Sequence, residues 1–151
     1  MTPIDHESCV RFVEQQYFGN VRDGNLDAVM ACFKAGANVM IRHGDNPERV
    51  FIAGSTGEES ELKEFYEHLC SNYHPWFGDF RHFIDTGQQR SACYFTVRLT
   101  PKAEGLYAGA GTQELHNCNF FEYRAGLIGH MIIYYSNSLA GGTDRPTGYP
   151  K

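Results

Sequence analysis

Four polar side chains fall within apolar rows of the sequence, where a site for small-molecule chemistry would need them. His82 lies in the apolar row of one predicted strand, Asn117 and Asn119 interrupt that of another, and Tyr17 lies on the apolar face of a predicted helix. Burying such a group without a partner costs about 1–3 kcal/mol, so these groups must be satisfied by one another, by water or by a ligand. Polar tips that converge in an apolar layer are typical of a ligand site, where a histidine can act as a general base. A closed hydrogen-bond network within the core is the alternative.

Helices are predicted in the first half of the chain, where apolar residues recur at spacings of three and four. The first helix follows Thr2 and ends near Gly19 or Gly24, and a second covers Leu26–Phe33. The most clearly amphipathic helix runs from 55 to 73. The first helix presents Tyr17 on its buried face.

Strands dominate the rest of the chain. Two short strands, 38–43 and 49–53, flank a turn at Gly44–Pro47. From Trp76 the period changes to two, which predicts an antiparallel meander with strands near 78–86, 90–100, 112–123 and 126–136. Helices followed by strands in this order favour an α+β fold, with a strongly curved mixed or antiparallel sheet, helices on one face and a pocket between the two layers.

Length and composition favour one domain with no charged or membrane partner. The 151 residues suit a single domain, 1–151, with an irregular tail from about 139. The net charge of -5 and the lack of a Lys/Arg cluster do not favour a nucleic-acid or membrane partner, because such proteins usually carry a basic patch. No signal peptide or apolar span is visible, so we expect a cytoplasmic protein. The five widely spaced cysteines are expected to be reduced, and His and Cys spacings predict no metal site.

The last predicted strand is apolar on both faces. Four of its residues alternate on one face, Leu127, Met131, Ile133 and Tyr135, and four on the other, Ile128, His130, Ile132 and Tyr134. A sheet whose outer face is also apolar commonly packs against a second subunit. We therefore expect a homodimer formed through the sheet.

The order of several loose motifs resembles the nuclear-transport-factor-2-like superfamily, which includes ketosteroid isomerases, SnoaL-like polyketide cyclases and scytalone dehydratases. The motifs are Gln16-Tyr17, Asp23–Asp27, Phe33 before Ala37–Val39, Gly57–Tyr66 and Asn119–Ile128. The resemblance covers nearly the whole chain. It implies a cone-shaped sheet wrapped around three N-terminal helices, with an internal pocket and no cofactor.

The resemblance also implies roles for individual residues. Comparison with the ketosteroid isomerases gives Tyr17 and Asn119 as donors to an oxyanion. The general base of those isomerases corresponds to Ile41, and the acid of the SnoaL-like cyclases falls near Ile133. Both positions are aliphatic here, so neither mechanism can operate unchanged.

The likeness to scytalone dehydratases implies a histidine mechanism. Phe80–Asp85 resembles the strand that carries their catalytic histidine, which gives His82 as the base, and Asn117–Asn119 resembles their Ser-x-Asn segment. The loop between the first two helices would supply an orienting acid, Asp23. The implied reaction is proton transfer on a hydrophobic oxygenated molecule, by dehydration, isomerisation or cyclisation.

Two other functions remain open. The chain could be a non-catalytic binding or association domain, since a fold does not determine function, or a small subunit of a ring-hydroxylating oxygenase. Whether the pocket serves catalysis or only binding, the residues expected to contact the ligand are Trp76, Phe80, Tyr94, Asn117, Phe121, Met131, Ile133, Tyr135 and Ile41.

Overall fold

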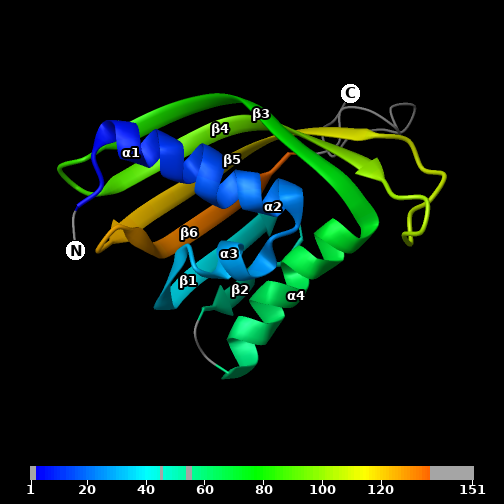
Figure 1. The fold of residues 1–151 in the computed structure, drawn as a ribbon, viewed down its shortest axis with the longest axis horizontal. Helices are drawn as coiled ribbons and strands as arrows, with labels where there is room; N and C mark the ends of the chain where they lie inside the picture. Colours follow the sequence, from blue (N-terminus) through cyan, green and yellow to red (C-terminus); the bar gives the residue numbers. More distant parts are fainter. Residues whose placement is uncertain (1–2, 45, 54–55, 137–151) are drawn as a thin grey trace.

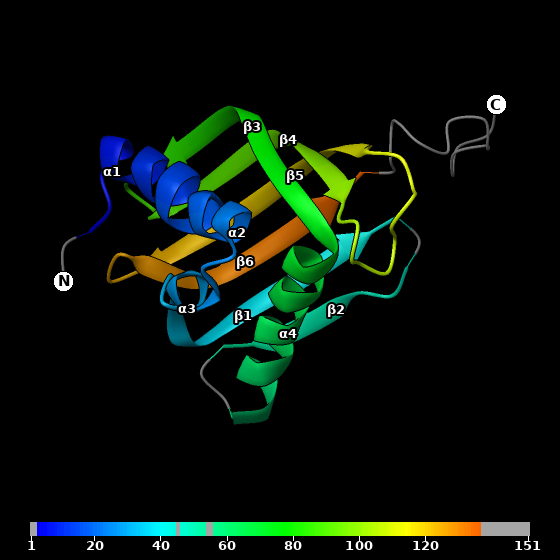
Figure 2. The ribbon, with the colours of Figure 1, turned by 45° about the vertical axis from the view of Figure 1, so that its right-hand side comes forward.

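A six-stranded sheet bends around the N-terminal helices, and its concave side holds the core (Figure 1). The computed structural model describes residues 3–44, 46–53 and 56–136, with the backbone alone for residues 56–60. A second view shows the N-terminal helices above the concave face and helix α4 (Thr56–Asn72) beside one end of the sheet (Figure 2). The fold class is α+β, as predicted. The expected tail from about 139 lies outside the described residues.

The first helix is continuous but changes its winding. It consists of α1 (His6–Arg11), a π-helical stretch η1 (Phe12–Phe18) and α2 (Gly19–Asp23). A capping box with Asp5 and Ser8 begins it. In the π-helical stretch the wider turn buries four bulky side chains, Phe12, Val13, Tyr17 and Phe18. The helix ends at Gly24, whose φ of 74° lies in the left-handed region that favours glycine.

The remaining helices close the concave side. Helix α3 (Leu26–Met30) is shorter than predicted and continues through a turn into the sheet. Helix α4 contacts both edge strands of the sheet and also α2 and α3. Because α4 directly follows β2 and directly precedes β3 in the chain, it links the two edges of the sheet.

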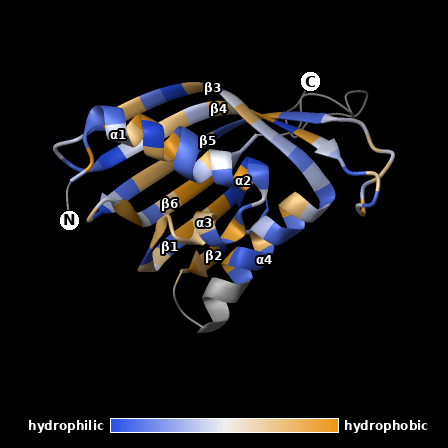
Figure 3. Cartoon of the chain, in the orientation of Figure 1, coloured by the Kyte–Doolittle hydropathy of each residue, from blue (hydrophilic) through white to orange (hydrophobic). Residues whose placement is uncertain are grey.

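The strands follow the predicted meander, with one parallel pair. Their order in the sheet is β2-β1-β6-β5-β4-β3, and β1 pairs with β6 in parallel while all other pairs are antiparallel. Figure 3 shows hydrophobic and hydrophilic residues alternating along the strands, as burial of one face requires. The bounds are β1 Phe33–His43, β2 Arg49–Ile52, β3 Tyr73–Asp85, β4 Arg90–Pro101, β5 Gln113–Arg124 and β6 Leu127–Tyr135.

Irregular pairing accompanies the curvature of the sheet. The register shifts between Phe33 and Asn38 in β1, where Gly36 has a φ of 83°, and between Gly78 and Arg81 in β3, where Asp79 has a φ of 54°. Such bulges bend a strand and increase its twist. The sheet can therefore wrap around the helix that ends at Gly24.

The structure changes three details of the sequence-based expectation. Strands β1 and β3 begin five residues earlier than predicted, at Phe33 and Tyr73 instead of 38 and 78. Ile128 is fully buried, although the alternation predicted it on the outer face. The reason is one extra residue, Gly129, between the paired positions Ile128 and His130 of β6, which reverses the alternation there.

Two glycines of the first helix should respond in opposite directions to alanine. At Gly24 the left-handed φ disfavours any side chain, so Gly24→Ala should lower the free energy of unfolding by about 1 kcal/mol. At Gly19 an added Cβ would meet only the Glu14 carbonyl oxygen, at 3.5 Å, so Gly19→Ala should raise it by about 0.5–1 kcal/mol. Urea denaturation followed by circular dichroism measures both changes. Equal effects of the two substitutions would contradict this account.

Candidate functional site

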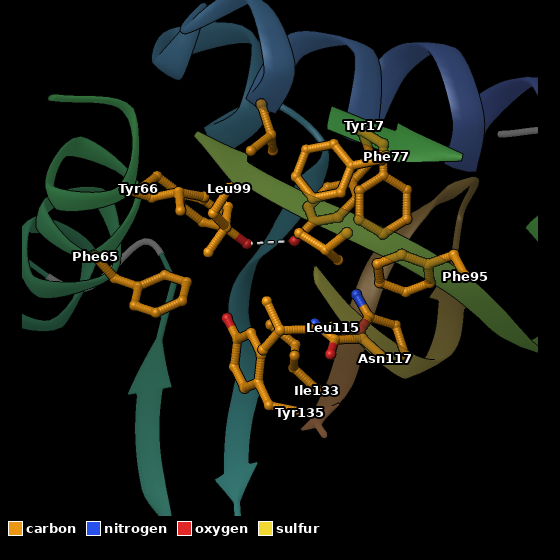
Figure 4. A pocket seen from close by; sticks show the side chains of 15 residues that line it. Tyr17, Phe65, Tyr66, Phe77, Phe95, Leu99, Leu115, Asn117, Ile133 and Tyr135 are labelled. Atoms are coloured by element: carbon orange, nitrogen blue, oxygen red, sulfur yellow. Dashed lines mark hydrogen bonds between the residues drawn. The ribbon is translucent and has the colours of Figure 1, made fainter. Parts of the chain in front are cut away.

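A narrow cavity lies between the first helix, α4 and the concave face of the sheet (Figure 4). Its volume is about 50 Å³, room for a few water molecules. Phe65, Leu69 and Leu99 of the wall are only partly buried. Because the cavity is so small, a larger ligand must displace these partly buried side chains. The apolar residues of the wall are Phe18, Val21, Phe65, Leu69, Phe77, Phe95, Val97, Leu99, Leu115 and Ile133.

Tyrosine hydroxyls form the main polar feature of the cavity. The hydroxyls of Tyr17 and Tyr66 lie 2.6 Å apart, and either one can donate the hydrogen bond. Figure 4 shows this pair at the cavity, with the Tyr135 hydroxyl also directed inward. Burial raises the pKa of all three tyrosines above the ordinary value. The hydroxyls therefore stay protonated and can donate to an oxygen of a ligand.

Two amides lie at the floor of the cavity. The Asn117 Oδ1 accepts a hydrogen bond from the backbone N–H of Ser136 at 3.3 Å. The Asn119 Nδ2 lies 3.9 Å from the Met131 sulfur, a weak acceptor, and its Oδ1 is buried without a hydrogen-bond partner among the described residues. Because an unsatisfied buried amide oxygen is costly, Asn119 is a candidate contact for water or a ligand.

A carboxylate and an imidazole form a pair at the other edge of the concave face. The Glu14 Oε2 lies 2.6 Å from the His82 Nε2, and the His82 side chain is only 11% exposed. A carboxylate accepts, so Nε2 carries the proton and Nδ1 of the neutral ring keeps its lone pair. That Nδ1 is buried and has no partner in the part of the chain that the structure describes. An imidazole held at one nitrogen and free at the other is the arrangement of a general base.

The pair lies beside the cavity and does not line it. Six residues, each paired with the next across the sheet, form a central inner row, namely His82, Cys93, Asn119, Ile133, Ile41 and Arg49. His82 is two strands from Asn119, which corresponds to about 10 Å between Cα atoms. Phe80 stacks on the His82 ring and contacts two residues of the cavity wall, Phe18 and Phe95. One layer of side chains therefore separates the base from the cavity.

Solved structures share this arrangement of helices and sheet. A proposed polyketide cyclase from Xanthomonas campestris pv. campestris is 20% identical, with 80% of this chain and 85% of that chain covered and a TM-score of 0.62. A second, from Silicibacter sp. TM1040, is 25% identical over 80% and 83% of the two chains, with a TM-score of 0.60. The chain has the nuclear-transport-factor-2-like fold.

A third structure with this fold comes from polyether biosynthesis. The epoxide hydrolase/cyclase-like enzyme SalBIII, with a role in pyran ring formation in salinomycin, is 15% identical and matches 93% of this chain and 97% of its own, with a TM-score of 0.62. No family model and no curated protein matches the sequence. The comparisons therefore bear on the fold, and the site must be interpreted from its own residues.

Several residues expected at a ligand site do line the cavity of this nuclear-transport-factor-2-like fold. They come from the first helix, β5 and β6 and are Tyr17, Asn117, Asn119, Ile133 and Tyr135. Three more expected residues belong to the core beneath the cavity, namely Phe121, Met131 and Ile41. Phe121 contacts the Tyr17 ring edge-on, so these three support the wall without forming it.

Three expectations need correction. Asp23 pairs with Arg22 at 2.9 Å and is about half exposed, so the acid that holds His82 is Glu14 and not Asp23. Tyr94 lies on the convex face, since it pairs in register with exposed Arg81. Trp76 is also 38% exposed, with the Arg98 guanidinium 4.4 Å above its ring. Strand alternation turns both aromatic rings away from the cavity.

The sequence offered weak signals for the two site residues that it did not predict. Glu14 stands three residues before Tyr17, which on a helix leaves both within reach of the same sheet. Tyr66 belongs to the apolar face of α4, where it was expected to contribute only to the core. Neither contact could be found from periodicity, because both join segments far apart in the chain.

The described helices and side chains provide two further findings. None of the described helices is long and apolar enough to cross a membrane. Across the described ranges, no three His, Cys, Asp or Glu side chains cluster as metal ligands would.

The buried tyrosines predict a loss of stability in alkali. Burial raises the pKa of Tyr17, Tyr66, Tyr123 and Tyr135 in the folded state, while tyrosines of the unfolded chain ionise near pH 10. Above that pH the folded state binds more protons than the unfolded state, so stability falls as pH rises. Below it, all four are protonated in both states and their contribution is constant.

Urea denaturation between pH 8 and pH 11 tests this prediction. Burial also raises the pKa of the Cys32 and Cys93 thiols, so the free energy of unfolding should begin to fall near pH 9. Above about pH 10 the fall should steepen, by up to about 1.4 kcal/mol per pH unit for each buried tyrosine. Tyr66→Phe removes one buried hydroxyl, so the free energy of unfolding should fall less steeply with pH, by the contribution of one tyrosine. A level profile to pH 11 would show that these hydroxyls ionise as easily in the folded state as in the unfolded state, and would contradict the prediction.

Proposed function

We propose that the chain is a cofactor-independent enzyme that moves a proton on a hydrophobic oxygenated molecule, with His82 as the base. The observation that carries this proposal is the buried, unpartnered Nδ1 of His82 opposite the Nε2 held by Glu14. Cyclase, isomerase and epoxide hydrolase names among structures of the same fold are consistent with such chemistry. The reaction would be a dehydration, an isomerisation or a cyclisation.

The base, its carboxylate partner and the hydrogen-bond donors of the cavity would each have a separate role in the reaction. His82 Nδ1 would take a proton from a carbon next to a carbonyl, and Glu14 would stabilise the imidazolium that forms. The negative charge that moves to the carbonyl oxygen would be stabilised by hydrogen bonds from the Tyr17–Tyr66 pair and from the Asn119 amide. Return of the proton to another carbon completes an isomerisation. In a dehydration, the enolate would expel hydroxide, which would take the proton from the His82 imidazolium and leave as water.

Substrate must bring its reacting carbon past the layer of side chains beside His82. Phe80 is partly buried and stacks on the imidazole, so a change of its rotamer would join the cavity to Nδ1. Burial of apolar substrate surface would supply the free energy for that change. The proposal thus makes Phe80 a gate between binding and chemistry.

Exchange of hydrogen for deuterium in a model ketone tests the base directly. Wild-type protein in D₂O should accelerate exchange of the protons next to the carbonyl of 4-phenylbutan-2-one, measured by proton NMR. His82→Ala should lose about a hundredfold to ten-thousandfold of that acceleration, and Glu14→Gln about tenfold or more. His116→Ala, on the convex face, is the control and should leave the rate unchanged. Retention of the rate in His82→Ala would reject His82 as the base.

Non-catalytic binding is the second candidate. The observation that favours it is that, among the described residues, the cavity wall contains no carboxylate and no imidazole. In the same experiment, binding of the ketone without accelerated exchange would support this function. Mass spectrometry of the protein under native conditions would then identify any apolar molecule retained through purification.

We also propose that two copies pair through the convex face of the sheet. An apolar row, defined by successive pairing across all six strands, consists of Phe83, Ala92, Phe120, Ile132, Met40 and Val50. Three of its side chains are among the exposed large apolar ones, at 64% for Phe83, 44% for Phe120 and 51% for Val50. An exposed apolar patch of this kind is typical of an interface.

Charges beside the apolar row favour a second copy as the partner. One flank carries Asp85, Glu122 and Arg90, and the other carries Arg81, Arg42 and Glu48, so the two flanks have opposite net charges. A twofold axis along the row would lay each flank over the opposite flank of the partner. The surface is therefore complementary to itself.

A charge placed in the middle of the row should separate the copies. Phe120→Arg should convert a dimer to a monomer in sedimentation velocity, because an unpaired guanidinium would be buried twice in the interface. Leu106→Arg, at an equally apolar and 79% exposed position outside the row, should leave the dimer intact. A monomeric wild-type protein would reject this pairing.

A further inference from the structure

Arg49 stands at the end of the central inner row opposite His82. It pairs with Ile41 across β1 and β2, so its side chain points to the concave side. Its guanidinium carbon lies 5.3 Å from the ring centre of Phe51 and 5.4 Å from that of Phe65. Cation–π contacts with two rings hold an otherwise exposed side chain in one position.

The position lies where the cavity meets the surface. Phe65 lines the cavity on one side and, on the other, a groove of about 500 Å³ that also includes Arg49. Burial raises the pKa of Tyr135, a cavity residue, and the charge of Arg49 opposes that rise. The guanidinium is therefore close enough to act on the interior of the cavity.

The guanidinium is available for a ligand. Within the described residues, no carboxylate lies within 4.0 Å of it, whereas Arg22, Arg42 and Arg98 each have one. Three other ionisable side chains share the groove, namely Glu61, Glu64 and His68. The two glutamates lower the potential of the groove without neutralising Arg49 by direct contact.

We propose that Arg49 binds the carboxylate of a substrate whose apolar body fills the cavity. The inference rests on the proposed function and adds a substrate class, apolar carboxylic acids with a second oxygen. Arg49 and Asn119 are three strands apart, about 14 Å between Cα atoms along the sheet. Both side chains lie on the concave side, so the carboxylate and the reacting oxygen would belong to opposite ends of one small molecule. The planar guanidinium suits a carboxylate, which it can bind through two hydrogen bonds.

A pair of probes equal in shape and different in charge tests the inference. Binding of 4-phenylbutanoate and of 4-phenylbutanamide is measured by calorimetry, and methyl NMR signals of Leu115 and Ile133 report whether each probe occupies the cavity. The wild-type protein should prefer the carboxylate about tenfold. Arg49→Met should abolish that preference and change amide affinity less than about twofold.

Two further variants separate recognition from general effects of charge. Arg49→Lys keeps the charge but loses the planar guanidinium, so its preference should fall between the wild type and Arg49→Met. Arg98→Met removes a charge from the convex face, outside the flanks of the apolar row, and should leave the preference unchanged. An equal loss for both probes in Arg49→Met would show that Arg49 only supports the wall, and would overturn the inference.

The outcomes also distinguish this inference from the proposed function. If both probes shift the cavity methyl signals but no variant changes their ratio, the inference is wrong and cavity binding stands. If neither probe shifts those signals in the wild-type protein, both the inference and cavity binding are overturned. If the carboxylate preference depends on Arg49 but His82→Ala keeps the exchange rate, the inference stands without the proposed base.

Discussion

The π-helical stretch Phe12–Phe18 is the constraint on which the candidate site depends. In an α-helix, Glu14 and Tyr17 would lie about 60° apart around the axis and point to neighbouring parts of the sheet. The wider turn, marked by the bond from the Gly19 N–H to the Glu14 carbonyl, separates them further. Glu14 can then reach His82 on β3 while Tyr17 reaches Tyr66 over the cavity. One local change in winding thus supplies both a charged pair and a hydroxyl pair.

Features set by local patterns could be predicted from the sequence. Alternation along β5 predicted that Asn117 and Asn119 face the interior, and they are 3% and 1% exposed. The same reasoning gave His82 an inward position and Tyr17 a buried one. It was wrong at Ile128, because one extra residue in β6 reverses the alternation and leaves no mark in the pattern. Local rules therefore give the face of a residue only as far as the next bulge.

Partners across the fold could not be predicted in the same way. Glu14 and His82 are 68 residues apart, and their contact depends on the π-helical turn and on the bulge in β3 together. The resemblance gave Asp23 as the acid that orients His82. This loop carboxylate is instead stabilised by its ion pair with Arg22 and by water, and burial beside His82 would remove it from that water. Tyr94 and Trp76 were expected in a pocket because they are aromatic, which does not determine the side of the sheet.

The aliphatic residues Ile41 and Ile133 in the middle of the central inner row explain why charge lies at the ends of that row. Both isoleucines are nearly inaccessible, and a carboxylate at either place would need partners that the apolar wall does not offer. Glu14 is instead 35% exposed, so water can solvate the charge while His82 receives its hydrogen bond. Arg49 is likewise exposed at the opposite edge. The interior then needs only neutral donors, and a substrate must bring its own polar groups to both ends of an apolar path.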